Sequence, residues 1–334
     1  MELPARLGVS LTGTGSFVPG ECLDNHQLSQ VLDTSDDWIT TRTGIRRRHL
    51  LSPRDSLASM ATEAAKKALA MADLAPKQLD LIILATSTPD DLFGSAGVIQ
   101  AQLEAMQAVA FDLTAACSGF VFGLVTAAQF IRSGAYRNVL LIGADALSRW
   151  VDWSDRRTCV LFGDAAGAVV LQASDRDCLL GFQLHTDGTL NHHLNLGYQA
   201  QVKTLVDRVC IHQGTYRPMT MNGQEIYRFA IQRVPEAIEK ALFQAGLTID
   251  QVNWLLMHQA NQRILDAVAE RLGLPAQKIV SNVAKYGNTS AASVPLALDQ
   301  ATRLGQIQPG DVLAIAGFGA GFSWGVAIIQ WNKN

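Results

Sequence analysis

AAKKALAMADLAPKQLDLIIL at residues 64–84 and AIEKALFQAGLTIDQVNWLLM at residues 237–257 are the two stretches that decide the fold. They align without gaps at an offset of 173 residues, and each has apolar residues at helical spacing, a turn and a short apolar run typical of a buried strand. The same offset carries NVLLI at 138–142 onto DVLAI at 311–315. One offset shared by two separate blocks predicts an internal duplication.

Each copy alternates helices with buried strands, a pattern that favours a mainly parallel sheet covered by helices. We therefore expect an α/β protein of two pseudo-symmetric halves, 1–178 and 179–334, with a site where strand-to-helix turns of both copies meet. Residues 178–220 interrupt the pattern and hold four histidines, but only the adjacent pair at 192–193 resembles a ligand spacing. We expect a connecting strand and loop there rather than a metal site.

The composition narrows the class of protein. The 334 residues are 48% hydrophobic and 17% charged, with a net charge of −3, so the chain can bury a large core and lacks the basic character of a nucleic-acid-binding protein. Five cysteines without a C-x-x-C pair indicate no disulfide framework or zinc site and fit a reducing cytosol. Residues 312–331 are free of charge but rich in glycine, which favours two strands around a tight turn over a membrane helix.

Cys117 is the first candidate for chemistry. It lies in FDLTAACSGFVFGL at residues 111–124, where a predicted strand ends and apolar residues take up helical spacing. Free N–H groups and the positive end of the helix dipole at such a turn favour the thiolate, so we expect a lowered pKa and a nucleophile. The alternative is a buried cysteine that acts as a small hydrophobic residue.

His258 and Asn288 are candidates from the second copy. His258 directly follows the predicted strand 252–257, and its counterpart in the first copy is Ala85, so a functional group has been added to one copy only. Asn288, in AKYGNTSAAS at 284–293, lies two residues before Ser290, which the offset pairs with Cys117. The alternatives are a core histidine and a helix cap.

Two further segments could bind an anion or a nucleotide. The glycines of AGFGAGFSWG at 316–325 could present N–H groups to a developing oxyanion, and the alternative is a tight hairpin between core strands. The segment TSDDWITTRTGIRRRHL at 34–50 could stack on a purine and hold phosphates, and the alternative is a solvated basic face. Its relevant side chains are Trp38, Arg42, Arg46, Arg47 and Arg48.

Taken together and in this order, the motifs TSDDWITTRTGIRRR, DLTAACSGF, HQANQRI, YGNTSAAS and GFGAGFSWG resemble β-ketoacyl-acyl-carrier-protein synthase III of the thiolase superfamily. The resemblance covers nearly the full length. It implies a thiolase-like five-layered αβαβα fold of two pseudo-symmetric halves, and a homodimer. It also implies a catalytic Cys-His-Asn triad, which falls on Cys117, His258 and Asn288.

The resemblance implies a role for each member of the triad. Cys117 would take the acetyl group of acetyl-CoA as a thioester, after which malonyl-acyl-carrier protein would enter. His258 and Asn288 would donate hydrogen bonds to the thioester oxygen as CO₂ is lost, and the backbone N–H groups of Cys117 and Ala320 would hold the tetrahedral oxyanion. Ala320 stands where glycine is frequent in the family, which requires that alanine tolerate the local backbone dihedrals.

Substrate-binding positions carry over in the same way. Acetyl-CoA is a substrate here, and the resemblance implies neither a cofactor nor a metal. A bulky ring at the acyl pocket would favour an acetyl primer. The expected positions are Trp38 and Arg156 around the adenine, Arg42 at a phosphate, Asn222 and Asn261 along the pantetheine tunnel, Phe318 at the substrate, Arg263 at the docked carrier protein, and Phe93 crossing the dimer interface to close the acyl pocket.

Several alternatives stay open. A related ketosynthase of a secondary pathway would use another acyl-CoA primer. A non-condensing partner that binds carrier protein would be expected to lack the nucleophile, and Cys117 argues against it. A cysteine hydrolase could use Cys117 and His258 but would need a path for water. Thiolases use a second cysteine, elongating synthases use two histidines, and chalcone-synthase-like enzymes are longer.

Overall fold

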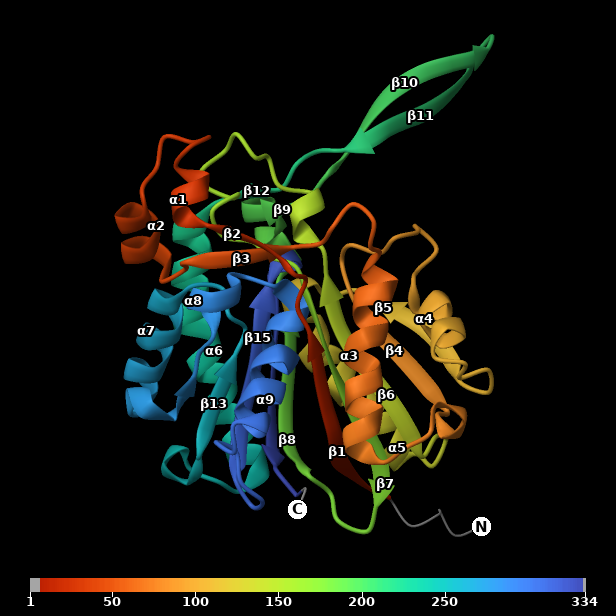
Figure 1. The fold of residues 1–334 in the computed structure, drawn as a ribbon, viewed down its shortest axis with the longest axis vertical. Helices are drawn as coiled ribbons and strands as arrows, with labels where there is room; N and C mark the ends of the chain where they lie inside the picture. Colours follow the sequence, from red (N-terminus) through yellow and green to blue (C-terminus); the bar gives the residue numbers. More distant parts are fainter. Residues whose placement is uncertain (1–6, 333–334) are drawn as a thin grey trace.

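Two five-stranded sheets of the same strand order form the frame of the molecule, which the computed structural model describes for residues 7–332 (Figure 1). From edge to edge the first sheet contains β1 (Gly8–Phe17), β7 (Ala165–Ser174), β6 (Asn138–Asp145), β4 (Leu81–Ala85) and β5 (Val109–Leu113). The second contains β8 (Leu179–Thr186), β16 (Ser323–Gln330), β15 (Val312–Gly319), β13 (Trp254–Met257) and β14 (Ile279–Val280). In both, the first three strands are antiparallel neighbours and the last three run parallel.

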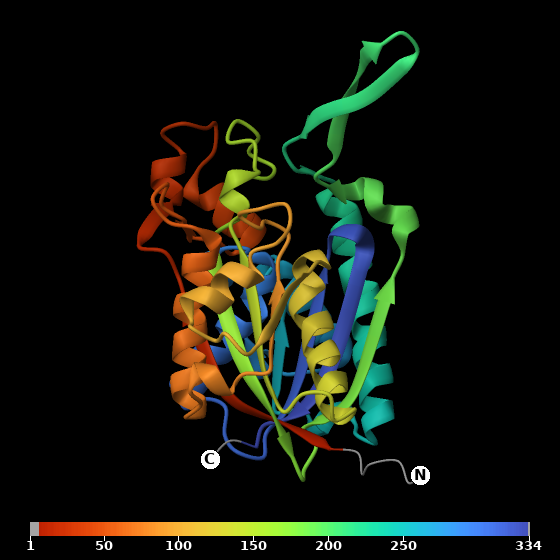
Figure 2. The ribbon, with the colours of Figure 1, turned by 90° about the vertical axis from the view of Figure 1, so that its right-hand side faces the viewer.

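Helices make the other three layers, as the resemblance implies (Figure 2). The expected mainly parallel sheet is wrong, because each sheet has as many antiparallel as parallel strand pairs. The helices α5 (Gly119–Arg132) and α9 (Ser293–Arg303) pack between the two sheets, whose facing side chains join one buried cluster. The helices α3 (Leu57–Ala72) and α4 (Ala96–Gln102) cover the outer face of the first sheet, and α6 (Gly223–Ala245) and α7 (Gln262–Leu272) cover that of the second. The predicted thiolase-like αβαβα fold is confirmed. The division into halves at residue 178 stays our proposal, which the sheet membership of the strands supports.

Local sequence explains the close packing of these layers. The strand β4 (LIILA) is buried on both faces, as expected for a central strand with helices on either side. In α3 the buried face is rich in alanine, and a Cβ on Gly13 or Gly15 of β1 would lie 2.2 Å from a helix carbonyl oxygen. Small residues on both partners therefore let this helix lie directly on the sheet.

The offset between the two halves changes by one residue along the chain. Asp80 N donates to Asn138 O, and the equivalent bond runs from Asn253 N to Val312 O, so the strand β6 corresponds to β15 at an offset of 174. The turns before α5 and α9 agree, because Ala116 and Ser290 both have left-handed φ angles, 48° and 50°. The predicted pairings of 138–142 with 311–315 and of Ser290 with Cys117 are therefore wrong by one residue. Between β13 and α9 the second copy is longer by one residue in sum, because it is shorter than the first copy before β14 and longer after it. The true counterpart of Cys117 is Ala291.

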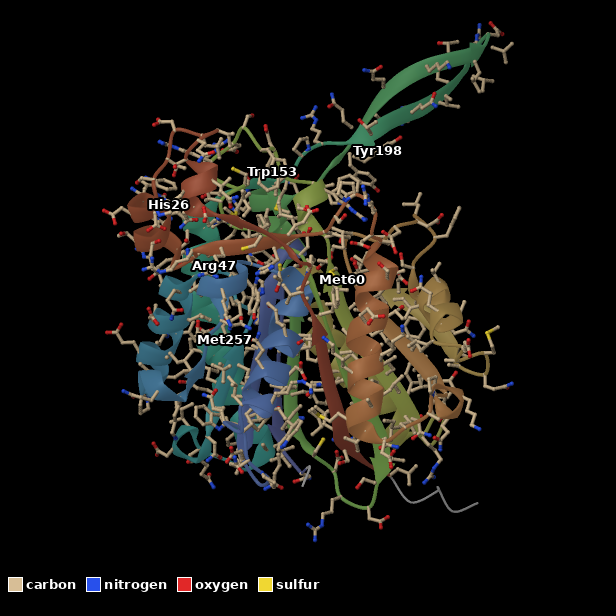
Figure 3. All side chains as sticks on the ribbon, viewed as in Figure 1. His26, Arg47, Met60, Trp153, Tyr198 and Met257 are labelled. Atoms are coloured by element: carbon tan, nitrogen blue, oxygen red, sulfur yellow. The ribbon has the colours of Figure 1, made fainter. Side chains whose placement is uncertain are left out.

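Shorter elements surround the carboxyl ends of the parallel strands. They are β2 (Glu21–Asp24), α1 (Asn25–Leu28), α2 (Asp36–Thr43), β3 (Arg47–Leu50), β9 (Leu194–Asn195), β12 (Thr220–Met221) and α8 (Val283–Tyr286). Between β9 and β12 the chain forms a long hairpin of β10 (Tyr198–Val206) and β11 (Val209–Tyr216), which projects from the body with Tyr198 at its base (Figure 3). The sequence predicted only a connecting strand and loop there, because a hairpin exposed on both faces carries no alternation of polar and apolar residues.

Four observations bear on the class of protein. Within residues 7–332 no helix is long and apolar enough to cross a membrane. The same residues contain no cluster of three or more His, Cys, Asp or Glu side chains that could hold a metal ion. The five cysteines are free thiols. The charge-free segment 312–331 forms β15, a tight turn and β16, as predicted.

Candidate active site

A cavity of about 660 Å³ opens where the turns of the two halves meet. It lies at the carboxyl ends of β4 and β13, the position that the duplication predicts for a shared site. Both halves supply its wall. The residues predicted from sequence that line it are Cys117, Asn261, His258, Asn288, Phe318 and Ala320.

Cys117 lies in a single 3₁₀ turn, Ala116–Ser118, between β5 and α5. Ala116 takes a left-handed φ of 48°, which reverses the chain directly before the cysteine. Gly119 begins the helix, and a Cβ there would lie 3.3 Å from Ala85 Cβ, so a small residue lets the turn reach the end of β4. Ser118 Oγ donates to Ala115 O at 2.6 Å, which fixes the turn from inside. The thiol is thus held on a rigid element.

The expected low pKa of Cys117 is wrong for the protein without a bound ligand. Burial is the main cause that raises the pKa of this thiol to about 12; a hydrogen bond from Ser290 acts in the opposite direction, and the Asp145 carboxylate adds to the rise. The sequence correctly placed Cys117 at the N-terminus of a helix. The cost of a thiolate in a buried site beside a carboxylate nevertheless outweighs the stabilisation by the helix. Cys117 therefore rests as a thiol.

His258 is buried and neutral. Burial lowers the pKa of the imidazole to about 3. Its Nδ1 lies 2.8 Å from Ser293 Oγ, the first residue of α9, and its ring packs edge-on against Phe318 at 5.2 Å between centroids. The Ser293 hydroxyl donates its one hydrogen to Ser290 O at 2.8 Å, so in this arrangement Nδ1 carries the ring hydrogen and donates to Ser293 Oγ. Nε2 is the ring nitrogen left for the cavity.

Asn288 presents a donor to the same cavity. Its backbone is fixed on both sides, since Asn288 N donates to Leu161 O at 2.8 Å and Asn288 O accepts from Gly163 N at 3.0 Å. Its side-chain Oδ1 accepts from Ser290 N at 3.0 Å. Because Oδ1 is occupied, the amide nitrogen Nδ2 is the group available for a ligand oxygen.

The glycine-rich turn leaves room above the thiol. A Cβ on Gly319 would lie 2.8 Å from Cys117 Cβ and 3.1 Å from both its N and its Sγ, so any side chain there would close the approach to the cysteine. Positive φ angles in this turn fall on Gly321 (72°) and Phe322 (46°), and not on Ala320. Alanine at 320 is therefore compatible with the backbone, as the sequence analysis required.

The predicted cluster of Trp38 with arginines exists, but both arginines already pack against the Trp38 ring. The Trp38 ring has the guanidinium carbons of Arg42 and Arg156 at 4.8 and 5.2 Å from its centroid. Arg156 also donates to Asp33 O at 2.6 Å. None of these three side chains lines the cavity itself.

Four other predicted residues have clear positions. Asn261 caps α7, donates to Arg42 O at 3.0 Å and lines the cavity. Asn222 caps α6 and is exposed, whereas its neighbours Met221 and Gly223 line the cavity instead. Arg263 is exposed, with its guanidinium carbon 5.7 Å from the centre of the Tyr227 ring. Phe93 is 97% exposed in the loop after β4 and does not line the cavity of its own chain.

Arg48 is not part of a basic face. It is fully buried, and its NH1 and NH2 groups donate to Asn25 Oδ1 at 2.8 Å and Val160 O at 2.7 Å. Burial lowers the pKa of this guanidinium to about 10. It joins the segment after β1 to the body, whereas Arg46 and Arg47 are exposed.

Sequence reasoning missed three residues that support the site. Ser290 Oγ lies 3.3 Å from Cys117 Sγ, Ser293 contacts His258, and Asp145 accepts from Ala291 N at 3.1 Å. The two serines stand in the YGNTSAAS motif, so their hydroxyls were visible as candidates. Asp145 ends a buried strand, and a carboxylate at a buried position of the sequence pattern could have indicated a functional or supporting residue.

Comparison with known proteins agrees with this geometry. Residues 111–188 match the family 3-oxoacyl-[acyl-carrier-protein (ACP)] synthase III, and residues 242–331 match its C-terminal part. A β-ketoacyl-[acyl-carrier-protein] synthase III from Nostoc sp. is 66% identical over 98% of this chain and 99% of the relative. The chain belongs to this family. Another member, from Thermosynechococcus vestitus, is 60% identical over 97% of the chain and 99% of the relative. Members of the family are acyltransferases, and this chain is one.

Solved structures of the synthase III family have the same fold. The enzyme from Aquifex aeolicus superposes with a TM-score of 0.88 at 43% identity, covering 97% of this chain and all of that one. The priming β-ketosynthase of the R1128 polyketide pathway superposes with a TM-score of 0.91 at 33% identity, covering 100% of this chain and 99% of that one. The OleA protein of Xanthomonas campestris, at 20% identity and a TM-score of 0.84, shares the fold.

Proposed function

We propose that this chain condenses acetyl-CoA with malonyl-acyl-carrier protein to give acetoacetyl-acyl-carrier protein, CoA and CO₂, the step that initiates fatty acid synthesis. Membership of the synthase III family supports the reaction class. The observation that carries the proposal is one cavity lined by a cysteine, a neutral histidine and an asparagine from two pseudo-symmetric turns. The donor of the acyl group and its acceptor use this cavity in turn.

The first half-reaction takes place at Cys117. Its sulfur attacks the acetyl thioester, CoA leaves, and the acetyl group stays on the enzyme as a thioester. The space above Gly319 supports an oxyanion position next to Cys117 N, and the backbone N–H of Ala320 is the second donor. Each donor of this kind is typically worth about 3 to 4 kcal/mol of barrier.

The second half-reaction uses His258 and Asn288. The Nδ2 group of Asn288 and the protonated Nε2 of the neutral His258 ring donate to the malonyl thioester oxygen while CO₂ leaves. This tautomer requires the Ser293 hydroxyl to turn from Ser290 O, to which it donates at 2.8 Å, to Nδ1, which lies at the same distance. Because the ring carries no charge, it stabilises the enolate without being tied to the departing carboxylate. The enolate carbon then attacks the acetyl carbonyl of acylated Cys117.

Recognition of the two phosphopantetheine substrates divides between two surfaces. Trp38 and Arg156 hold the adenine of CoA, Arg42 a phosphate, and Asn261 with Asn222 the pantetheine arm, while exposed Arg263 meets the acidic carrier protein. Replacing Trp38 with Ala removes a stacking surface worth about 1 to 3 kcal/mol and raises the KM for acetyl-CoA. Arg263→Glu weakens use of malonyl-carrier protein instead, with a difference that fades at high salt. The opposite pattern would contradict this division.

We also propose that the enzyme is a homodimer that works in the cytoplasm, where its five free thiols stay reduced. Among the residues that the structure describes, β5 is an edge strand of the first sheet with no neighbour on its outer side. Nearby apolar side chains are exposed, including Phe93 at 97%, Val98 at 50% and Val109 at 50%, as expected of a surface that a second copy covers. Phe93 would then close the acyl pocket of the partner, next to a phenyl ring at Phe318. Val109→Asp should shift the mass measured by light scattering from dimer to monomer, and an unchanged dimer would contradict the assignment.

A steady-state assay tests the reaction. Purified enzyme with acetyl-CoA and malonyl-carrier protein should release one CO₂ for each acetoacetyl-carrier protein detected by mass spectrometry. Release of free acetate without malonyl substrate would identify a hydrolase instead. A panel of acyl-CoAs tests the second candidate, a secondary-pathway ketosynthase, which the similarity to the R1128 priming enzyme favours. A preference for acetyl-CoA excludes it, and a preference for a longer or branched primer supports it.

A further inference from the structure

Two buried serines join the turn that holds Cys117 to the glycine-rich turn. Ser118 directly follows the cysteine, and Ser323 directly follows the turn Ala320–Phe322. Both side chains are buried, and their Oγ atoms lie 2.8 Å apart although the residues are 205 positions apart in the sequence. Ser118 gives its one hydrogen to Ala115 O at 2.6 Å, so Ser323 is the donor in the bond between the two hydroxyls.

The other contacts of the Ser323 hydroxyl involve the same two turns. Its Oγ lies 3.4 Å from Ala115 O, in the turn before α5, and 3.4 Å from Ala320 O, in the glycine-rich turn. Both distances are longer than the 2.8 Å to Ser118 Oγ, which is therefore the main partner. The hydroxyl of Ser323 thus acts as a link between the turns.

The glycine-rich turn needs such a link, because part of its backbone is strained. Phe322 takes a left-handed φ of 46° although it has a side chain. A strained backbone of this kind persists only where the surrounding structure determines it. The Phe322 ring packs edge-on against Phe229 at 4.8 Å between centroids, and Phe322 O accepts from Asp187 N at 2.9 Å. These contacts fix the turn to its own half, whereas Ser323 fixes it to the turn of Cys117.

The space between the turns cannot be held by a larger side chain. The backbone N–H groups of Cys117 and Ala320 are the two oxyanion donors of the proposed mechanism, and Gly319 lies beside the first of them. A Cβ on Gly319 would lie 3.1 Å from Cys117 N and would occupy the place of the oxyanion. The separation of the two donors must therefore be set by contacts away from this space.

At the equivalent positions of the duplication, both serines are alanines. The strands β16 and β7 are equivalent, and their register on β15 and β6 makes Ala165 the counterpart of Ser323. The counterpart of Ser118 at the offset of 174 is Ala292. Ala165 and Ala292 are fully buried and share one small apolar cluster. At these positions, hydroxyls therefore occur only at the turn that holds Cys117.

A different hydrogen bond ties the equivalent turn before α9 to the neighbouring sheet. Ala291 N, the counterpart of Cys117 N, donates to Asp145 at 3.1 Å. Cys117 cannot use the same kind of tie, because in the proposed mechanism its N–H has to stay free for the substrate. The bond between Ser118 and Ser323 ties the turn to the sheet and leaves that N–H free.

We propose that Ser118 and Ser323 are positioning residues that set the separation of the two oxyanion donors, Cys117 N and Ala320 N. This inference rests on the proposed acylation of Cys117 and assigns a role to two residues outside the Cys-His-Asn triad. The donors act best when they already lie about 2.7 to 3.1 Å from the place where the oxyanion forms. The bond between the serines holds both turns in that arrangement before the substrate arrives.

Two substitutions of Ser323 test the proposal. Ser323→Ala removes the hydroxyl and introduces the residue that the equivalent strand carries at Ala165. Ser323→Thr keeps the hydroxyl, and a β-branched residue suits the extended backbone there, with φ −95° and ψ 140°. Thr126→Ala is the matched control, since its half-buried hydroxyl donates to Phe122 O of its own helix, α5, at 2.8 Å.

The experiment measures acetylation and decarboxylation separately. Rapid quench and mass spectrometry give the single-turnover rate of Cys117 acetylation over a range of acetyl-CoA concentrations. The data yield the rate at saturation, the concentration for half-maximal rate and the final fraction of acetylated enzyme. Decarboxylation of malonyl-carrier protein, which in the proposed mechanism needs His258 and Asn288, reports on the rest of the site.

We expect Ser323→Ala to lower the saturating rate of acetylation by about 10- to 10²-fold, the usual effect of a small displacement of catalytic groups. The half-saturating concentration, the final fraction acetylated and the rate of decarboxylation should stay as in wild type. Ser323→Thr should restore the rate, and Thr126→Ala should match wild type. Ser118→Ala should also be slow, and adding Ser323→Ala to it should cause little further loss, because the same bond is already broken.

Three results would overturn the role of the serine pair while leaving the condensation reaction intact. The first is acetylation at the wild-type rate in Ser323→Ala. The second is a rate in Ser323→Thr as low as in Ser323→Ala, which would show that the hydroxyl is not what matters. The third is an equal loss of acetylation and decarboxylation, which would show a merely structural role. No acetylation of the wild-type enzyme would instead contradict the proposed function itself.

Discussion

The turn at residues 115–119 and the turn at residues 289–293 have similar backbones but differ in what lies next to their backbone N–H groups. In the first, Cys117 N faces Gly319, and the space beside it is clear of side chains. In the second, the equivalent Ala291 N donates to Asp145, and Asp145 is the counterpart of Gly319 at the offset of 174. The second backbone N–H is bound to a carboxylate of the protein, whereas the first has space beside it. The second turn thus supports the proposal that the first binds a substrate oxyanion.

The strand ends next to these turns differ in the same complementary way. Ala85 packs against Gly119, with a Cβ-to-Cβ approach of 3.3 Å if Gly119 had a side chain. Their counterparts His258 and Ser293 fill the same space with a hydrogen bond of 2.8 Å. The two halves have equivalent backbones. They differ because small residues of the first half stand where the second half has polar residues at the equivalent positions. In the proposed mechanism, the nucleophile Cys117 lies in one half, and His258 and Asn288, which polarise the second substrate, lie in the other.

The largest effect should come from removing the polar side chains that the second half contributes to the cavity. His258→Ala and Asn288→Ala should each lower the rate of condensation by about 10²- to 10³-fold, the usual cost of a lost oxyanion donor, while Cys117 still becomes acetylated. Parallel assays of acetyl-enzyme formation and malonyl decarboxylation separate the two steps. Loss of acetylation with decarboxylation unharmed would reverse the assignment of the two turns.

Filling the open anion position should be nearly as damaging. In Gly319→Ala the new Cβ would meet Cys117 Cβ at 2.8 Å and Cys117 N at 3.1 Å, so the turn must shift. We expect acetylation to slow by about 10²-fold, with a smaller effect on malonyl decarboxylation. Gly188→Ala is the control, because a Cβ at Gly188 meets no atom within 4 Å. Acetylation at the wild-type rate in Gly319→Ala would show that the space above the thiol is not the oxyanion position.

A smaller effect should follow from replacing Ser293 of the second half with a small apolar residue, since its counterpart in the first half is Gly119. Ser293→Ala removes the partner of His258 Nδ1, and a buried nitrogen that loses its hydrogen bond costs about 1 to 3 kcal/mol. Condensation should fall by about tenfold through kcat, with the KM for malonyl-carrier protein little changed. An unchanged kcat would mean that the imidazole is oriented by Phe318 packing alone.

The smallest effect concerns stability against acid. The folded-state pKa of His258 is lowered to about 3 from an ordinary 6.5, so below pH 6.5 the unfolded chain takes up a proton that the folded chain refuses. Stability therefore falls as the pH drops from about 6.5 towards 3, and this contribution is absent above 6.5. His258→Asn should lose less stability than wild type over that range in thermal melts. Parallel curves for the two proteins would contradict a buried neutral imidazole.

The sequence predicted the frame well and the chemistry of its interior only in part. Repeated apolar runs such as LIILA and WLLM are local, and they were enough to establish two equivalent sheets and to place His258 at a strand end. The shift of offset to 174 was invisible, because it depends on which carbonyl Asn253 N reaches. The raised pKa of Cys117 was also beyond a local pattern, since it arises from burial and from Asp145, a residue distant in the sequence.

Mass spectrometry of the enzyme after incubation with acetyl-CoA tests the central claim most directly. The claim is that the open turn captures the acyl group and the filled turn does not. We predict one acetyl group per chain, carried by the peptide that contains Cys117, and none in Cys117→Ala. An acetyl group on any residue of the second turn, or no adduct on Cys117 in a folded enzyme, would contradict the account.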